Sequence, residues 1–222
     1  MKIGVLIPSR GDRTKFLNHA KWLLDQQTRK PDEILIVDYP PKSNDYDITP
    51  RYRYGCQELF NRGCDIVFFW EDDDWYSSEY IEFMLNSWID AGKPKIFGIG
   101  YTYYYHILVN KYRKFTHSHK SSACCSMVTN EILRISYPKD NDPFLDTAMW
   151  KQLSPHPHVP LCTVSPEKIY HLGMKHGIGL SGGSKHHDKN GYNLNFYDDS
   201  NLNLLKNNID EKSLTFYNTF KL

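Results

Sequence analysis

The chain has 222 residues, and its 27 basic and 26 acidic residues give a formal net charge of +1. This length is sufficient for one domain with a substantial core, and the near-neutral charge gives no electrostatic case for nonspecific nucleic-acid binding. The five cysteines include no Cys-x-x-Cys pair and resemble neither a disulfide framework nor a zinc knuckle. Without a signal peptide or an apolar run long enough to span a bilayer, we expect a soluble, cytoplasmic protein.

Three short apolar stretches in the N-terminal third predict buried strands. They are Ile3–Ile7, Glu33–Val37 and Asp65–Trp70. Continuous apolar runs rich in β-branched residues are typical of strands covered on both faces, as in a parallel sheet. Pro8 ends the first run, as expected where a strand gives way to a loop.

The segments between these strands predict helices. Apolar residues recur in steps of three and four over 12–27, and 54–62 leads into the third strand as a second helix. Strand, helix, strand, helix, strand predicts an α/β domain with a mostly parallel, doubly wound sheet flanked by helices.

Polar residues follow each predicted strand. Ser9 and Arg10 come after the first, Asp38 after the second, and four consecutive acids, Glu71 to Asp74, after the third. Ligands of such sheets bind outside the carboxyl ends of the strands, and carboxylates packed this closely need a cation unless they form only a solvated turn. The pattern predicts one crevice suited to a nucleoside diphosphate held partly through a divalent metal.

Three motifs carry a resemblance to a known family. Ile7–Arg10, Val37–Asp38 and Trp70–Trp75 together resemble the opening strand, the base-binding aspartate and the Asp-x-Asp region of GT-A nucleotide-sugar glycosyltransferases, family 2 in particular. The likeness extends to about Trp150. It implies one GT-A domain that moves a sugar, from a UDP-sugar donor, to a hydroxyl acceptor on a glycan, protein or other molecule.

The resemblance implies roles for the residues at the strand ends. Asp38 would contact the base and Asp72 the ribose, and the donor-binding set is Pro8, Ser9, Arg10, Asp38 and Asp72. Two arginines before the second predicted helix, Arg51 and Arg53, would reach the base or diphosphate, or else lie solvated on the surface.

The resemblance also implies a bound divalent cation. Asp73 is the implied metal ligand, and because the motif also fits Asp72–Asp74, Asp74 is retained. Oxygen ligands suit Mn²⁺ or Mg²⁺ better than zinc. Some GT-A enzymes add a late histidine to the metal site, and the candidates for it here are His171 and His176, with His171 taken as the ligand.

The acceptor side is expected after residue 120. Ser122–Val128 resembles the small-residue strand that lines this side of the family, and Asp146 opens a helical pattern where inverting members place a general base. The family usually has Glu before this acid, and here Leu145 stands instead. A carboxylate is needed to take the acceptor proton, although Asp146 also suits a helix N-cap, and Asp142 is either the second candidate base or a turn former.

The domain divides, on this reading, into a donor half over 1–76, an acceptor half over 77–180 and a tail over 181–222. The tail predicts a mobile loop over 181–195 and one helix over 201–222.

Gly177–Gly182 has the form G-x-G-x-x-G but follows no clear strand, so it predicts a donor lid or a surface loop rather than a dinucleotide site. The Tyr103–Tyr105 run suits a sugar face or simple core filling.

Two other functions fit the same pattern. A nucleotidyltransferase would share the sheet and the metal-binding acids, but it usually has a glycine-rich, basic phosphate loop after the first strand, of which 8–12 holds only a trace. A non-catalytic nucleotide- or carbohydrate-binding module would not need acids at both Asp73 and Asp146.

Overall fold

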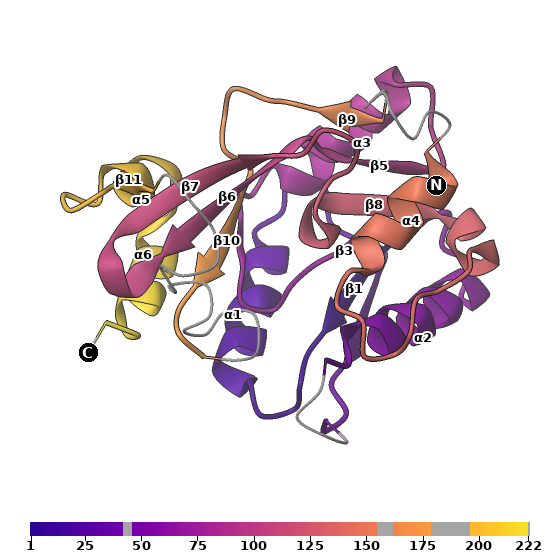
Figure 1. The fold of residues 1–222 in the computed structure, drawn as a ribbon, viewed down its shortest axis with the longest axis horizontal. Coiled ribbons are helices and arrows are strands. Elements are labelled where there is room, and N and C mark those ends of the chain that lie inside the picture. The colour runs from indigo at the N-terminus through magenta and orange to yellow at the C-terminus, as the bar shows by residue number, and fades with distance from the viewer. Residues whose placement is uncertain (42–45, 155–161, 179–195, 222) are drawn as a thin grey trace.

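The predicted strands form the centre of a six-stranded sheet in the computed structural model, which describes residues 1–41, 46–154, 162–178 and 196–221 (Figure 1). The sheet order is β2-β1-β3-β8-β5-β9. Its strands are β1 (Ile3–Pro8), β2 (Glu33–Val37), β3 (Ile66–Phe69), β5 (Ile96–Ile99), β8 (Ser126–Thr129) and β9 (Thr163–Val164). β1 runs parallel to β2 and β3, whereas β8 is antiparallel to β3 and β5. The expected mixed sheet, parallel at its N-terminal strands, is confirmed.

Helices cover this sheet as the periodicity predicts. They are α1 (Thr14–Asp25), α2 (Ile48–Asn61), α3 (Tyr80–Asp90) and α4 (Leu145–Leu153). α2 begins earlier than the predicted 54–62, because Arg51 and Tyr52 in its first turns are also buried. Gly55 lets α2 approach the sheet closely, since a Cβ at this position would lie 2.1 Å from a methyl carbon of Leu6.

A second sheet of five strands, in the order β11-β7-β6-β10-β4, completes the molecule. Its strands are β4 (Trp75–Tyr76), β6 (Tyr101–His106), β7 (Lys111–Thr116), β10 (His171–Lys175) and β11 (Tyr197–Asp198). β10 pairs parallel to β6 and antiparallel to β4, which directly follows the acid run. This pairing brings residues near position 175 beside residues near position 74. Figure 1 shows the β6–β7 hairpin at the opposite end of the molecule from α2.

Two predicted elements differ from the structure. The first half of the expected strand Ser122–Val128 is a 3₁₀ turn, η2 (Ala123–Cys125), and only β8 continues it as strand. The expected C-terminal helix is two helices, α5 (Asn203–Asn208) and α6 (Glu211–Asn218). Asp210 causes the break, because its side chain accepts a hydrogen bond from the Ser213 amide at 2.7 Å and so starts a new helix.

Short 3₁₀ turns complete the described chain, at η1 (Ile107–Val109) and η3 (Asn130–Arg134). The buried apolar side chains of both sheets form one continuous cluster, as expected for a single domain. The loop predicted over 181–195, and most of the glycine motif at 177–182, lie outside the described residues. Among the helices in the described part of the chain, none has the length and apolar character needed to span a bilayer.

Candidate active site

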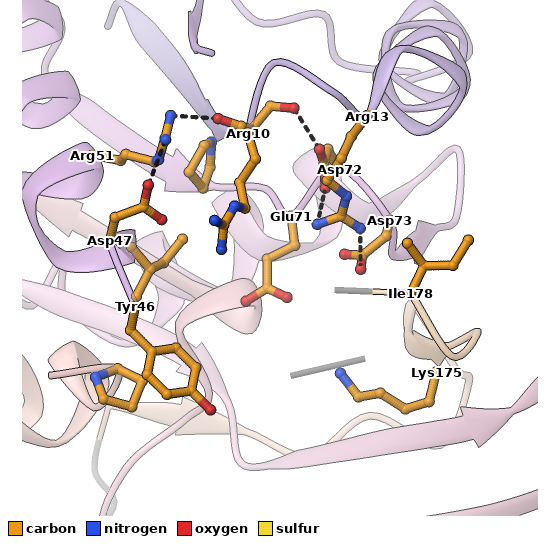
Figure 2. Close-up of a pocket in the computed structure, with 14 residues that line it drawn as sticks. Arg10, Arg13, Tyr46, Asp47, Arg51, Glu71, Asp72, Asp73, Lys175 and Ile178 are labelled. Carbon is orange, nitrogen blue, oxygen red and sulfur yellow. Dashed lines mark hydrogen bonds and ion pairs between the residues drawn. The ribbon is translucent and has the colours of Figure 1, made fainter. Parts of the chain in front are cut away.

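A cavity lies at the carboxyl ends of β1 and β3, where the sequence placed a ligand crevice. Its lining comes from five parts of the chain: Pro8, Ser9, Arg10 and Arg13; Tyr46, Asp47, Ile48 and Arg51; Glu71, Asp72 and Asp73; Pro143; and Lys175 and Ile178. Most of the predicted strand-end residues are therefore brought together. Figure 2 shows them surrounding a common space.

Arg13 bridges two of the acids. Its guanidinium lies 3.1 Å from Asp72 Oδ1 and 2.5 Å from Asp73 Oδ2. The loop after β1 also holds Asp72 through the Ser9 hydroxyl, which donates to Asp72 Oδ2 at 2.6 Å. The aspartates that follow β3 are thus positioned by residues that follow β1, the neighbouring strand of the sheet.

Asp73 has a second partner in the residue that directly follows β10. His176 Nε2 lies 2.9 Å from Asp73 Oδ2, and both side chains are buried. Although burial alone would raise the pKa of Asp73, the positive charge of Arg13 and the hydrogen bond from His176 hold this pKa well below its usual range. Asp73 therefore keeps its negative charge.

Glu71 differs from its neighbours because its carboxylate points into the cavity (Figure 2). Burial, followed by repulsion from Asp74 and Asp73, raises the pKa of Glu71 to about 8. The side chains of Arg10 and Lys175 point toward the same space from opposite sides. The cavity thus combines acids that favour a cation with cations that favour an anion, the pairing that a metal diphosphate presents.

Two predicted metal ligands, Asp74 and His171, lie behind this arrangement. They pair with each other, with Asp74 Oδ2 2.9 Å from His171 Nε2, and Asp74 Oδ1 also accepts from the Met174 amide at 2.9 Å. Both residues are buried, and neither is among the residues that line the cavity.

Arg51 is a buried connector rather than a free surface residue. Its guanidinium donates to the main-chain carbonyls of Ser9 and Val37, at the ends of β1 and β2, and forms an ion pair with Asp47 at 2.6 Å. By joining two strand ends it shapes one wall of the cavity. The alternative that the sequence left open for Arg51, a solvated side chain, is wrong.

Arg53 and Asp38 lie farther out. Arg53 pairs with Asp140 at 2.8 Å, and both side chains are exposed. Asp38 follows β2 at the expected edge of the sheet, is exposed and does not line the cavity.

The candidate base Asp146 lies in the first turn of α4, where its Oδ2 is 2.6 Å from Lys120 Nζ. The N-cap position of α4 is Phe144, so the alternative role of Asp146 as an N-cap is wrong. Asp142 acts as a turn former, because its Oδ1 accepts from the Phe144 amide at 2.8 Å. This turn directs Pro143 toward the cavity.

Sequence reasoning missed Arg13, Tyr46 and Lys175 as lining residues. Arg13 could have been identified from the sequence, because it lies in the same loop after β1 as Arg10. Lys175 is the last residue of β10, and its place beside the acids depends on the pairing of β10 with β4. The sequence pointed to both His171 and His176 as a late histidine of the metal site, and it is His176 that contacts Asp73.

No protein-family model and no curated protein sequence matches the chain. Among solved structures, it matches S. aureus TarS 1–349 in complex with UDP-GlcNAc, with 13% identity and a TM-score of 0.56 over 83% of this chain and 61% of that chain. The same TarS fragment in complex with UDP matches with 15% identity and a TM-score of 0.52, over 78% and 60%. The chain thus spans about three fifths of the TarS fragment. At this identity the likeness concerns the fold alone, and the protein has the expected GT-A fold.

Proposed function

We propose that the protein is a glycosyltransferase that moves a sugar from a UDP-sugar to a hydroxyl acceptor. One observation carries the proposal: in a GT-A fold, Glu71, Asp72 and Asp73 meet Arg10 and Lys175 around a cavity at the strand ends (Figure 2). A nucleoside diphosphate with a divalent cation has the mixed charge that such a cavity complements.

Of the two substrates, the nucleotide-sugar donor has more support than the acceptor. Arg10 and Lys175 face the cavity and are suited to the two phosphates, because guanidinium and ammonium groups donate charge-assisted hydrogen bonds. UDP as the nucleotide agrees with the TarS crystal structures, which contain UDP and UDP-GlcNAc. Asp72 is our proposed ribose contact, and Asp38, at the next strand end, our proposed base contact. Family 2 membership is part of this proposal.

The carboxylates of the cavity are suitable ligands for Mn²⁺ or Mg²⁺. Asp73 keeps its charge, and Glu71 presents a carboxylate whose pKa is raised by burial and by repulsion from Asp74 and Asp73. These two residues would hold the ion, and His176 and Arg13 orient Asp73. When bound, the cation would stabilise the charge that develops on the departing diphosphate.

Asp146 is our proposed general base, in an inverting reaction. An acceptor hydroxyl becomes a good nucleophile only when a carboxylate within hydrogen-bond reach removes its proton. Lys120 now contacts Asp146 and is partly exposed, so an acceptor hydroxyl would have to take the position of this ammonium. Asp142 is the less favoured candidate, because its carboxylate already binds the main chain of the turn.

The test is a thermal-shift screen of UDP-, GDP- and TDP-sugars and nucleoside triphosphates, each with and without Mn²⁺. A ligand that binds only the native state raises its stability by RT ln(1 + [L]/Kd), which is about 2.7 kcal/mol at 100 times Kd. We expect a Mn²⁺-dependent shift with UDP and UDP-sugars. A larger shift with triphosphates would favour nucleotidyl transfer, and equal shifts without metal would contradict the proposal.

A further inference from the structure

Two cysteines and a histidine form a separate polar cluster beneath the acid run. Cys124 and Cys125 belong to η2, and His171 begins β10. One ligand atom of each residue lies within 4.8 Å of the others, and all three residues are buried. Cys125 Sγ is 3.1 Å from His171 Nδ1. None of the three lines the cavity described above.

The chemistry of these donors differs from that of the cavity. Two thiols and an imidazole are a sulfur- and nitrogen-rich set, which zinc favours, whereas the carboxylates of the cavity favour Mg²⁺ or Mn²⁺. Both cysteines are free, so their sulfur atoms are available as ligands once deprotonated.

The orientation of His171 suits a metal ligand. The carboxylate of Asp74 accepts from the Met174 amide through Oδ1 and contacts His171 Nε2 through Oδ2, so Asp74 holds this ring nitrogen in place. With Nε2 held by Asp74, Nδ1 is the ring nitrogen on the side of the thiols, 3.1 Å from Cys125 Sγ. Metal-binding histidines commonly have this arrangement, in which a carboxylate fixes the nitrogen that does not bind the metal.

The cysteine segment is fixed as well. The main-chain carbonyl of Cys124 accepts hydrogen bonds from the hydroxyls of Tyr76 at 3.2 Å and Tyr80 at 3.4 Å. Two segments that are far apart in sequence are therefore held with their sulfur and nitrogen donors facing each other. Such preorganisation reduces the conformational entropy that metal binding would cost.

A fourth ligand is available on the cavity side. Glu71, Asp74 and Cys124 also have ligand atoms within 4.8 Å of one another. The hydrogen bonds of Asp74 engage both of its oxygens, which leaves a water molecule, or the carboxylate of Glu71 when the cavity holds no Mn²⁺ or Mg²⁺, to complete a tetrahedral site. Because Glu71 also faces the cavity, it marks a route by which an ion could enter (Figure 2).

We propose that Cys124, Cys125 and His171 bind a zinc ion that joins η2 to β10 beneath the active site. The ion would replace the Cys125–His171 hydrogen bond with bonds to both segments, and binding would release the two thiol protons. This site is distinct from the Mn²⁺ or Mg²⁺ position at Asp73, and its role is structural. It does not depend on the identity of the donor or acceptor.

Cobalt substitution tests the proposal on the whole 222-residue chain. Co²⁺ bound to thiolates gives an intense charge-transfer absorption in the near ultraviolet, which Co²⁺ bound only to carboxylates lacks. We expect metal-free protein to develop this band up to one equivalent of Co²⁺ and to lose it when Zn²⁺ is added. Zinc should also raise the melting temperature, as expected for a ligand of the native state.

Variants assign the band to the cluster. Cys124→Ser and Cys125→Ser should each lower its intensity markedly, whereas Cys56→Ser, a buried cysteine of α2, should leave it unchanged. Asp73→Asn should also leave it unchanged, although it removes the proposed Mn²⁺ ligand. The absence of a thiolate band in the unmodified protein would overturn the proposal without relying on any variant, as would a full band in both serine variants. UDP binding with Mn²⁺ is a separate measurement, so the proposed function and the zinc site can fail independently.

Discussion

The hydroxyl of Tyr217 donates a hydrogen bond to the main-chain carbonyl of Asp73 at 3.2 Å, across 144 positions of the sequence. The same C-terminal segment also supports the side-chain partner of Asp73. The His176 ring packs against Phe16 at 4.3 Å, and Phe220 stacks on Phe16 at 4.8 Å. The C-terminal segment therefore supports the candidate metal ligand directly through Tyr217 and indirectly through Phe220, Phe16 and His176.

Tyr217→Phe tests this support. The buried ring stays, but the hydrogen bond to the Asp73 carbonyl is lost, at a cost of about 1 kcal/mol in stability. We expect weaker Mn²⁺-dependent UDP binding, measured by calorimetry, with the fold preserved in circular dichroism. Tyr137→Phe is the matched control, because the buried Tyr137 hydroxyl has no hydrogen-bond partner in the described part of the chain. Equal UDP affinity in both variants would show that Tyr217 only stabilises the fold.

Asp73→Asn tests the cation site. The substitution removes the charge but little volume, so we expect the fold to survive and Mn²⁺-dependent UDP affinity to fall by about 100-fold or more. Asp25→Asn, at an exposed position of α1, controls for the loss of one surface charge. If Asp73→Asn bound UDP and Mn²⁺ as well as the unmodified protein, the ligand assignment within Glu71–Asp74 would be wrong.

Asp146→Asn tests the base. If Asp146 takes the acceptor proton, donor affinity should stay nearly unchanged while turnover falls by roughly 10²–10⁴-fold. Lys120→Gln breaks the same ion pair from the other side and so measures what the pair contributes to stability. If Asp146 is the general base, turnover should fall strongly in Asp146→Asn but not in Lys120→Gln. Similar changes in melting temperature with near-normal turnover in both variants would leave Asp146 as a structural partner of Lys120.

His19 predicts a pH dependence of stability. It is buried between α1 and α6, stacked on Phe216 at 4.1 Å, and burial lowers the pKa of its imidazole to about 4. Above pH 6.5, the usual value, the ring is neutral in both the folded and unfolded states. As the pH falls from about 6.5 to about 4, only the unfolded state takes up the proton, so the free energy of unfolding decreases.

The measurement compares urea unfolding at pH 7 and pH 5 for the unmodified protein and His19→Phe, which keeps an aromatic ring at this position. The unmodified protein should lose about 1–2 kcal/mol more than the variant on acidification. An equal loss in both proteins would mean that His19 is protonated in the folded state as readily as in the unfolded chain.

The sequence alone determined the N-terminal half of the sheet and the place of the cavity. β1, β2 and β3 are short apolar runs whose ends carry polar residues, and in a parallel sheet those ends must meet at one edge. Ser9, Arg10 and Asp72 could therefore be assigned to one site without coordinates. Local patterns suffice there because each strand carries its own apolar signal, and β1 and β3 are buried along their whole length.

Only the tertiary structure decided which residues complete the site. Lys175 and His176 reach the acids because β10 pairs with β4, and this pairing has no local signature in the sequence. The same register turned His171 away from Asp73 and toward Cys125, so neighbouring histidines that look equivalent in sequence contact different acids. In a strand, side chains at positions 171 and 176 face opposite ways unless the chain turns between them, and which one meets Asp73 depends on packing across the whole fold.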